Sequence, residues 1–197
     1  MKGTRHIRTA LFGLLTLSSI GMSGQAPGVA RPQVGMAATY RGPARDLENL
    51  YKSAFQKIVL AAEAMPADQY RYKPHGDSPS FASLVRTVID GEHAACDEIN
   101  ETPASQRTPV PAETASKGEM LAALKLAGTA CEHSYGALTM ENAGDLKVSG
   151  NTKRGQISIL AWNYAHNAEQ YGMMSAYLAD KGVKPAAPAR SNPPAQQ

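Results

Sequence analysis

The stretch HNAEQYGMM, residues 166–174, contains the two residues whose types and spacing come nearest to a metal-binding motif. His166 and Gln170 are four positions apart. Four residues of α-helix turn through about 400°, so both side chains would lie on one face. Two histidines at this spacing bind divalent metals through their ring nitrogens. Here the second ring is replaced by an amide, which is a weak ligand, so a metal would need ligands from elsewhere in the chain.

Four segments show the apolar spacing of amphipathic helices, and strand alternation is scarce. Apolar residues recur at intervals of three and four over residues 47–65, 78–102, 116–138 and 156–180. Ser116 and Glu119 have the spacing of a capping box at the start of the third segment. A polar, glycine-containing loop is expected over residues 141–155. Four facing stripes predict an all-α fold, a four-helix bundle, with linkers long enough to cross it.

The first 30 residues have the order of a secretory signal peptide. Basic residues precede the apolar run Thr9–Ile20, and small and turn-forming residues follow it. The run is shorter than the roughly 20 residues of a transmembrane helix. We therefore expect cleavage after Ala26 or Ala30, no stable membrane anchor after cleavage, and an exported protein that is periplasmic or secreted.

The mature chain is expected to be one bundle domain over residues 44–183. It would lie between a flexible N-terminal segment, residues 31–43, and a disordered tail rich in proline and alanine, residues 184–197. The basic residues of the signal peptide account for the whole formal net charge of +3. A chain without a basic surplus lacks the electrostatic footprint of a nucleic-acid binder. The expected partner is an unknown small molecule or protein, and a homodimer is left open.

Three stretches of the chain together have the pattern of a known family. MPADQYRYKP follows the first predicted helix, SPSFASLVRTV enters the second, and HNAEQYGMMSAYLADKGVKP covers the end of the fourth. By these motifs the chain resembles the exported branch of the DinB-like four-helix bundle proteins over residues 44–186. The resemblance implies a DinB-like bundle, and the last motif is its most specific part.

The resemblance also implies a metal site, because the family holds zinc or nickel with one histidine of the second helix and two of the fourth. Those three positions fall on Thr87, His166 and Gln170. Only His166 is retained, so we expect a degenerate metal site and no resident cofactor, with zinc or nickel as the metal if one binds. Asp90 and Glu169 are the carboxylates near these positions that could complete a rebuilt site, since carboxylates also bind zinc.

The two cysteines, Cys96 and Cys131, lie in the second and third predicted helices. An even count in an exported chain favours a disulfide, and the resembling proteins carry cysteines at matching places. A bridge would close a loop of about 35 residues and stabilise the fold by a few kcal/mol; two buried thiols that never meet are the alternative. A catalytic pair of Cys131 with His133 is excluded, because helical positions two apart point about 200° apart.

Two functions fit these residues. The first is a non-catalytic binding or stress-related module, whose polar pocket would be formed by Thr87, Asp90, His166, Glu169 and Gln170. The second is a metal-dependent thiol transferase or hydrolase, as the resemblance implies, in which a metal activates a thiol or a water. The replacement of two of the three ligand histidines favours the first function. We therefore predict no catalytic residue, although enzyme activity is left open.

Overall fold

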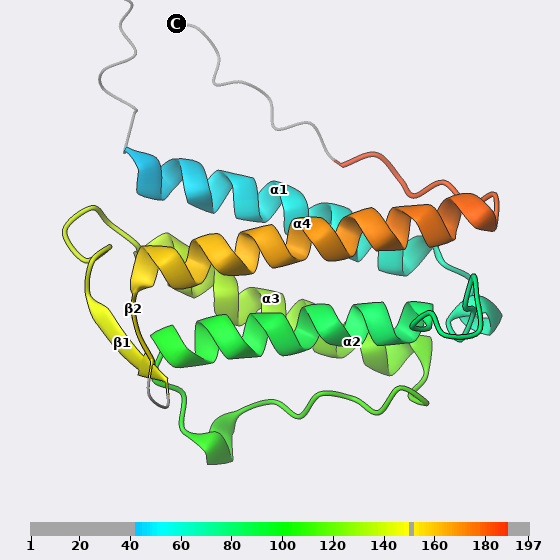
Figure 1. Cartoon of the computed structure of the whole chain (residues 1–197), viewed down its shortest axis with the longest axis horizontal. Coiled ribbons are helices and arrows are strands. Elements are labelled where there is room, and N and C mark those ends of the chain that lie inside the picture. Colours follow the sequence, from blue (N-terminus) through cyan, green and yellow to red (C-terminus); the bar gives the residue numbers. More distant parts are fainter. Residues whose placement is uncertain (1–41, 150–151, 189–197) are drawn as a thin grey trace, which may run out of the picture. The chain divides into compact units, whose positions relative to one another are not determined.

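The described part of the chain, residues 42–149 and 152–188 of a computed structural model, is a bundle of four α-helices (Figure 1). The helices are α1 (Pro43–Ala64), α2 (Phe81–Glu92), α3 (Lys117–Ala137) and α4 (Gln156–Asp180). The predicted all-α four-helix bundle is confirmed. The predicted signal peptide, most of the segment 31–43 and the end of the tail 184–197 lie outside the described residues.

The order of the helices in space follows from one long crossover. Within the bundle, α1 packs mainly against α3 and α4, and α2 also packs mainly against α3 and α4, so α1 and α2 are diagonal neighbours. Figure 1 shows that the segment joining α2 to α3 runs back along the length of the bundle, so α2 and α3 are parallel. The sequence predicted linkers long enough for this path. The short 3₁₀ turn Ala104–Gln106 lies within this segment.

Local signals explain where the helices begin. At α1, Gly42 adopts a positive φ of 78° and Pro43 occupies the first turn, where its missing N–H costs nothing. At α2, the Oγ of Ser80 accepts a hydrogen bond from the Ser83 N–H at 3.0 Å. At α3, the predicted capping box of Ser116 and Glu119 is confirmed. A cap of this kind stabilises a helix by about 1 kcal/mol.

The helix α2 does not stop at Glu92 but continues through a π-helical turn, His93–Asp97, to Ile99. A π-helical turn accommodates five residues with wider spacing than an α-helix, and such turns are frequent at functional sites. Cys96 lies inside this turn and is fully buried. The turn is thus attached to the core on one side, while its other side faces the segment that precedes α4.

That segment differs from the prediction, because part of the loop expected over residues 141–155 is a β-hairpin. Strands β1 (Leu146–Ser149) and β2 (Thr152–Gly155) pair antiparallel, with Leu146 opposite Gly155. Ion pairs attach the hairpin to the end of α2: Lys147 Nζ lies 2.6 Å from a carboxylate oxygen of Glu101, and Arg154 Nη2 lies 3.1 Å from one of Glu98. Few alternating residues signal such short, half-exposed strands, which is why the sequence pattern missed them.

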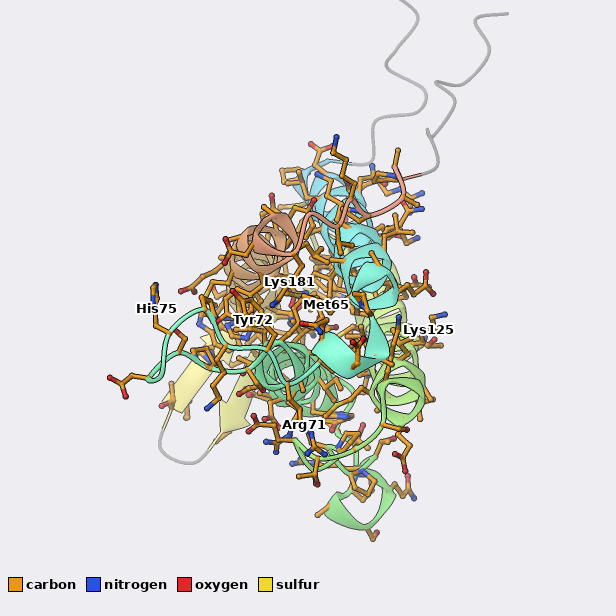
Figure 2. All side chains as sticks on the ribbon, turned by 90° about the vertical axis from the view of Figure 1, so that its right-hand side faces the viewer. Met65, Arg71, Tyr72, His75, Lys125 and Lys181 are labelled. Atoms are coloured by element: carbon orange, nitrogen blue, oxygen red, sulfur yellow. A yellow bond between two sulfur atoms is a disulfide. The ribbon has the colours of Figure 1, made fainter. Side chains whose placement is uncertain are left out.

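The opposite end of the bundle is closed by contacts between the loop after α1 and the ends of α3 and α4 (Figure 2). This loop contains the 3₁₀ turn Ala67–Gln69. Lys117 Nζ donates to the main-chain oxygens of Glu63 and Met65, at 2.6 and 2.8 Å, where α1 ends. Lys181 Nζ lies 3.3 Å from the centre of the Tyr72 ring. None of the helices within the described ranges is long and apolar enough to cross a membrane.

Candidate functional site

His166, the one retained histidine of the implied metal site, lies on α4 and faces α2. Its Nε2 is 3.2 Å from the main-chain carbonyl oxygen of Thr87. A carbonyl oxygen can only accept, so Nε2 must carry the hydrogen and donate. The Thr87 hydroxyl donates instead to the carbonyl oxygen of Ser83, at 2.9 Å. The structure therefore brings Thr87 and His166 together, but through the backbone of Thr87 and not through its side chain.

The imidazole of His166 stacks on an aromatic ring and lies against a glycine. The Trp162 ring stacks on it, with centroids 5.2 Å apart and an interplanar angle of 9°. On the other helix, a Cβ atom at Gly91 would lie 2.6 Å from Cδ2 of His166, closer than real Cβ contacts come. The ring thus occupies the space that any other residue at position 91 would fill.

The remaining predicted pocket residues are divided between core and surface. Gln170 is buried, with 5% of its surface exposed, and its Oε1 has no hydrogen-bond partner among the described residues. Asp90 and Glu169 are exposed. The two carboxylates therefore lie at the surface, whereas the amide lies in the core.

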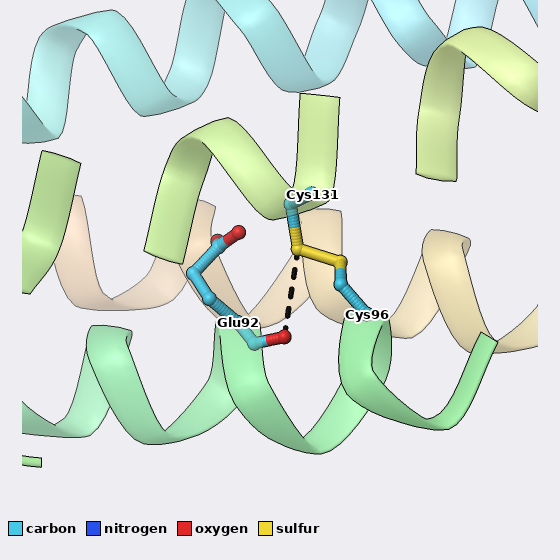
Figure 3. A group of neighbouring side chains, drawn as sticks. All are labelled: Glu92, Cys96 and Cys131. Atoms are coloured by element: carbon cyan, nitrogen blue, oxygen red, sulfur yellow. Dashed lines mark hydrogen bonds between the residues drawn. A yellow bond between two sulfur atoms is a disulfide. The ribbon is translucent and has the colours of Figure 1, made fainter. Parts of the chain in front are cut away.

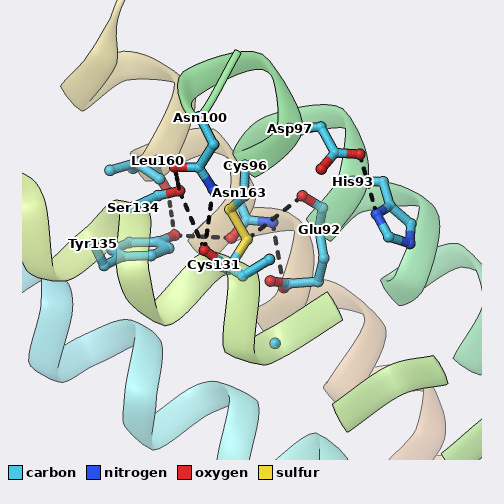
Figure 4. The surroundings of a disulfide bond; sticks show 12 residues. Glu92, His93, Cys96, Asp97, Asn100, Cys131, Ser134, Tyr135, Leu160 and Asn163 are labelled. Atoms are coloured by element: carbon cyan, nitrogen blue, oxygen red, sulfur yellow. Dashed lines mark hydrogen bonds and ion pairs between the residues drawn. A yellow bond between two sulfur atoms is a disulfide. The ribbon is translucent and has the colours of Figure 1, made fainter. Parts of the chain in front are cut away.

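A buried carboxyl group that the sequence reasoning did not select lies deeper in the bundle. Glu92 on α2 is 1% exposed. Its carboxylate accepts from the Tyr51 hydroxyl at 2.8 Å and from Nδ2 of Asn167 at 2.6 Å, with Nδ2 of Asn163 at 3.4 Å. The Tyr135 hydroxyl lies 2.9 Å from Oδ1 of Asn163 (Figure 4). All four helices contribute to this polar network.

The environment of Glu92 changes its acidity. Burial raises the pKa of the Glu92 carboxyl to about 7, although the hydrogen bonds from Asn167, Tyr51 and Asn163 act in the opposite direction. Burial, together with the nearby Glu92, also raises the pKa of the Tyr51 and Tyr135 hydroxyls above the ordinary range. The tyrosines therefore remain neutral donors at neutral pH, while Glu92 has both protonation states available there.

Beside Glu92 lies the disulfide (Figure 3). Cys96 and Cys131 are bonded, with Cα atoms 5.1 Å apart, which confirms the predicted pairing. The Cys131 Sγ lies 3.5 Å from the main-chain oxygen of Glu92. A carboxylate oxygen of Glu92 and the two sulfurs lie within 4.8 Å of one another, as three metal ligands would. The sulfurs are bonded to each other, however, and a cysteine sulfur is a good metal ligand only as a thiolate.

The fold can be compared with proteins of known structure. No family model matches the sequence, and no curated protein matches it. The structure matches a DinB-like protein from Bacillus subtilis with a TM-score of 0.58 and 19% identity, over 71% of this chain and 93% of that one. It matches a DinB-like protein from Bacillus cereus with a TM-score of 0.58 and 8% identity, over 74% and 97% of the two chains.

The chain has the DinB-like fold. This confirms the fold that the sequence motifs implied. At these identities the likeness concerns the fold, so the site has to be judged from its own residues.

The three positions implied for a metal in the DinB-like fold are a poor ligand set for zinc or nickel. The Nε2 of His166 is engaged with a carbonyl oxygen, and the Thr87 hydroxyl is engaged with its own helix. The third position, Gln170, offers an amide oxygen, and transition metals prefer imidazole and thiolate. These residues do not fit a transition metal in the observed arrangement.

The sequence does contain signals for the buried polar network around Glu92 in this DinB-like fold. Glu92 falls one helical turn after Val88, on the apolar stripe of the second helix, where a charged residue is unexpected. Asn163 and Asn167 are four apart on the fourth helix, so they share a face. A search for polar residues on the core faces of the helices would have found all three.

Proposed function

We propose that this chain is an exported, non-catalytic binding module built on the DinB-like fold. The observation that carries the proposal is the contact of His166 Nε2 with the Thr87 carbonyl oxygen, at 3.2 Å. An Nε2 atom that donates a hydrogen bond has no lone pair for a metal, so only Nδ1 of the ring could bind one in this tautomer. His166 in this state positions α4 on α2, with Trp162 stacked on its ring and Gly91 against its Cδ2 and Nε2 atoms.

Export is supported by the signal-like segment and by the disulfide, since disulfides persist in oxidising compartments. The mature protein would then act in the periplasm or outside the cell. Its partner would be a small molecule or a protein, because the mature chain has no basic surplus for nucleic acid. Without a metal to activate a thiol or a water, the chemistry of a thiol transferase or hydrolase has no source in these residues.

The alternative, a metal-dependent thiol transferase or hydrolase, has one observation in its favour. The Oε1 atom of Gln170 is buried and has no hydrogen-bond partner in the described ranges. It lies one helical turn from His166, so it is an acceptor that a ligand near the imidazole would satisfy. This candidate requires the His166 ring to leave the Thr87 carbonyl oxygen.

Elemental analysis of the mature protein tests the two candidates. We expect zinc and nickel well below one atom per chain after dialysis, both in the native protein and in His166→Ala. The control is His133→Ala, which changes an exposed histidine on α3. Stoichiometric metal that persists in His133→Ala and disappears in His166→Ala would overturn the binding-module proposal and support the enzyme.

A further inference from the structure

A cavity of about 440 Å³ lies between the end of α2 and the β-hairpin, apart from His166 and Gln170. We call it the hairpin cavity. The charged residues around it come from separate elements: the π-helical turn and the residues after it, the crossover segment and β2. They include His93, Asp97, Glu98, Arg107 and Arg154.

Unsatisfied polar atoms are concentrated around the hairpin cavity. Six buried side-chain nitrogen or oxygen atoms of the described residues have no hydrogen-bond partner, and four belong to residues that line this one cavity. The four are His93 Nε2, Glu98 Oε1, Arg154 Nε and Asp97 Oδ2, of which Asp97 Oδ2 makes no hydrogen bond but has two ion-pair contacts. Each such atom costs about 1–3 kcal/mol when it stays unpaired. Their concentration makes this cavity the place where a bound molecule would supply the missing hydrogen bonds, after small rotations of side chains that are enclosed in the observed arrangement.

The walls of the hairpin cavity carry both signs of charge in fixed positions. Asp97 is 5% exposed, and its Oδ2 lies 3.3 Å from His93 Nδ1 (Figure 4). The same oxygen lies 3.8 Å from Arg107 Nε. Arg154 uses Nη2 to donate to Glu98 Oε2 at 3.1 Å, which leaves its Nε and the Glu98 Oε1 unpaired. These ion pairs thus hold the walls of the cavity together, and the unpaired Arg154 and Glu98 atoms remain as donor and acceptor for a ligand.

We propose that the hairpin cavity binds an α-amino acid as a zwitterion, with the carboxylate at Arg154 and His93 and the ammonium at Asp97 and Glu98. An anion alone would meet the carboxylates of Asp97, Glu98 and Glu101 unfavourably, and a cation alone would meet the arginines. A molecule with both charges a few bonds apart satisfies both sets of atoms with charge-assisted hydrogen bonds. The cavity volume lies within the range of roughly 300–1,000 Å³ of small-molecule sites.

The disulfide contributes to the construction of this site. Cys96 lies in the same π-helical turn as His93 and Asp97, and its bond to Cys131 fixes the turn on α3. The backbone of the turn is therefore held in place before a ligand arrives, which lowers the entropic cost of binding. This inference rests on the proposed binding function, to which it assigns a site and a class of ligand.

Calorimetric titration of the oxidised mature protein tests the proposal. The probes are the twenty common amino acids, each up to about 10 mM, followed by the N-acetyl and the carboxamide forms of those that bind. We expect saturable one-to-one binding of at least one amino acid. Blocking either the ammonium or the carboxylate should weaken it at least tenfold. The absence of saturable binding by any amino acid, or equal binding of the blocked forms, would overturn the proposal.

Variants locate the site. Asp97→Asn and Arg154→Gln should each weaken binding of the amino acid at least tenfold. Lys125→Ala, which removes an ion pair with Glu63 elsewhere on the surface, should leave it unchanged. Equal affinity in all folded variants would refute this location, and the blocked ligands decide the question even if Asp97→Asn does not fold. The metal analysis is separate, since His166-dependent metal would overturn the proposed function without changing the titration.

Discussion

At the scale of the residue, Glu92 is the group whose chemistry is most changed by its surroundings. Its carboxyl is almost completely buried, and its partners are the neutral donors Tyr51, Asn163 and Asn167. No cation makes a hydrogen bond or ion pair with it in the described part of the chain, so the charged form is penalised by burial more than it is stabilised. The folded protein therefore holds a proton here that the unfolded chain releases.

This proton makes stability depend on pH in a definable window. The pKa of Glu92 rises from 4.5 to about 7 on folding, so the folded state binds more protons between these values. The free energy of unfolding should therefore fall as pH rises from 4.5 to 7, by roughly 3 kcal/mol for this group. In Glu92→Gln this decrease should be absent, as measured by urea unfolding at a series of pH values.

The matched control for that series is Glu132→Gln, which changes an exposed carboxylate on α3 and should keep the native dependence on pH. An unchanged slope in Glu92→Gln would show that another group is responsible. Because groups such as Glu48, whose burial is outweighed by ion pairs that lower its pKa, change stability in the opposite direction, the difference between the native protein and Glu92→Gln is the decisive quantity. A native-minus-variant difference that increases across the window would contradict the raised pKa itself.

At the scale of the element, the approach of α4 to α2 depends on a residue without a side chain. Gly91 lies mid-helix, where glycine is unfavourable by about 1 kcal/mol relative to alanine. The His166 ring fills the space beside it, and an added methyl group would lie 2.6 Å from the ring. Close packing of the two helices thus offsets the poor helix propensity of Gly91.

Gly91→Ala should therefore destabilise the protein by about 1–3 kcal/mol through overpacking, despite the better helix propensity of alanine. In the His166→Ala background the same substitution should cost much less, because the clashing ring is gone. Thermal or urea unfolding of the two single variants and the double variant measures this coupling. Gly136→Ala on α3, where nothing lies within 4 Å, is the control and should be neutral or stabilising. Additive effects at positions 91 and 166 would show that the contact is absent in solution.

At the scale of the whole molecule, the disulfide and the crossover segment both connect α2, in the first half of the chain, to α3, in the second half. The bond between Cys96 and Cys131 joins α2 to α3, and the segment between these helices runs along the bundle (Figure 1). A cross-link of 35 residues' separation restricts the unfolded chain much more than the folded one. Most of its contribution therefore acts on the unfolded state.

Reduction should lower the free energy of unfolding by about 4 kcal/mol, as expected for a closed loop of this length. Urea unfolding with and without a thiol reductant measures the loss, and the variant with both cysteines changed to serine should not respond to the reductant. A count of free thiols under denaturing, non-reducing conditions checks the bond directly. Two reactive thiols per chain would contradict it.

The sequence predicted the fold well and the candidate site only partly. The spacing of apolar residues is repeated over many turns in each helix, so the helices, the bundle and the capping box at Ser116 were evident. The hairpin was missed because its strands are four residues each and largely exposed, with little alternation. The partners of His166 were missed because a motif specifies side chains, whereas the actual contact is with the main chain of Thr87.

Proteolysis of the crossover segment would not separate the two halves of the molecule. The polar residues 101–116 all lie between the two cysteines, so they belong to a covalent ring closed by the disulfide. Exposed segments of this composition are where proteases cut first. A single cut there would open the ring without releasing either piece, and α1 with α2 would remain covalently joined to α3 with α4.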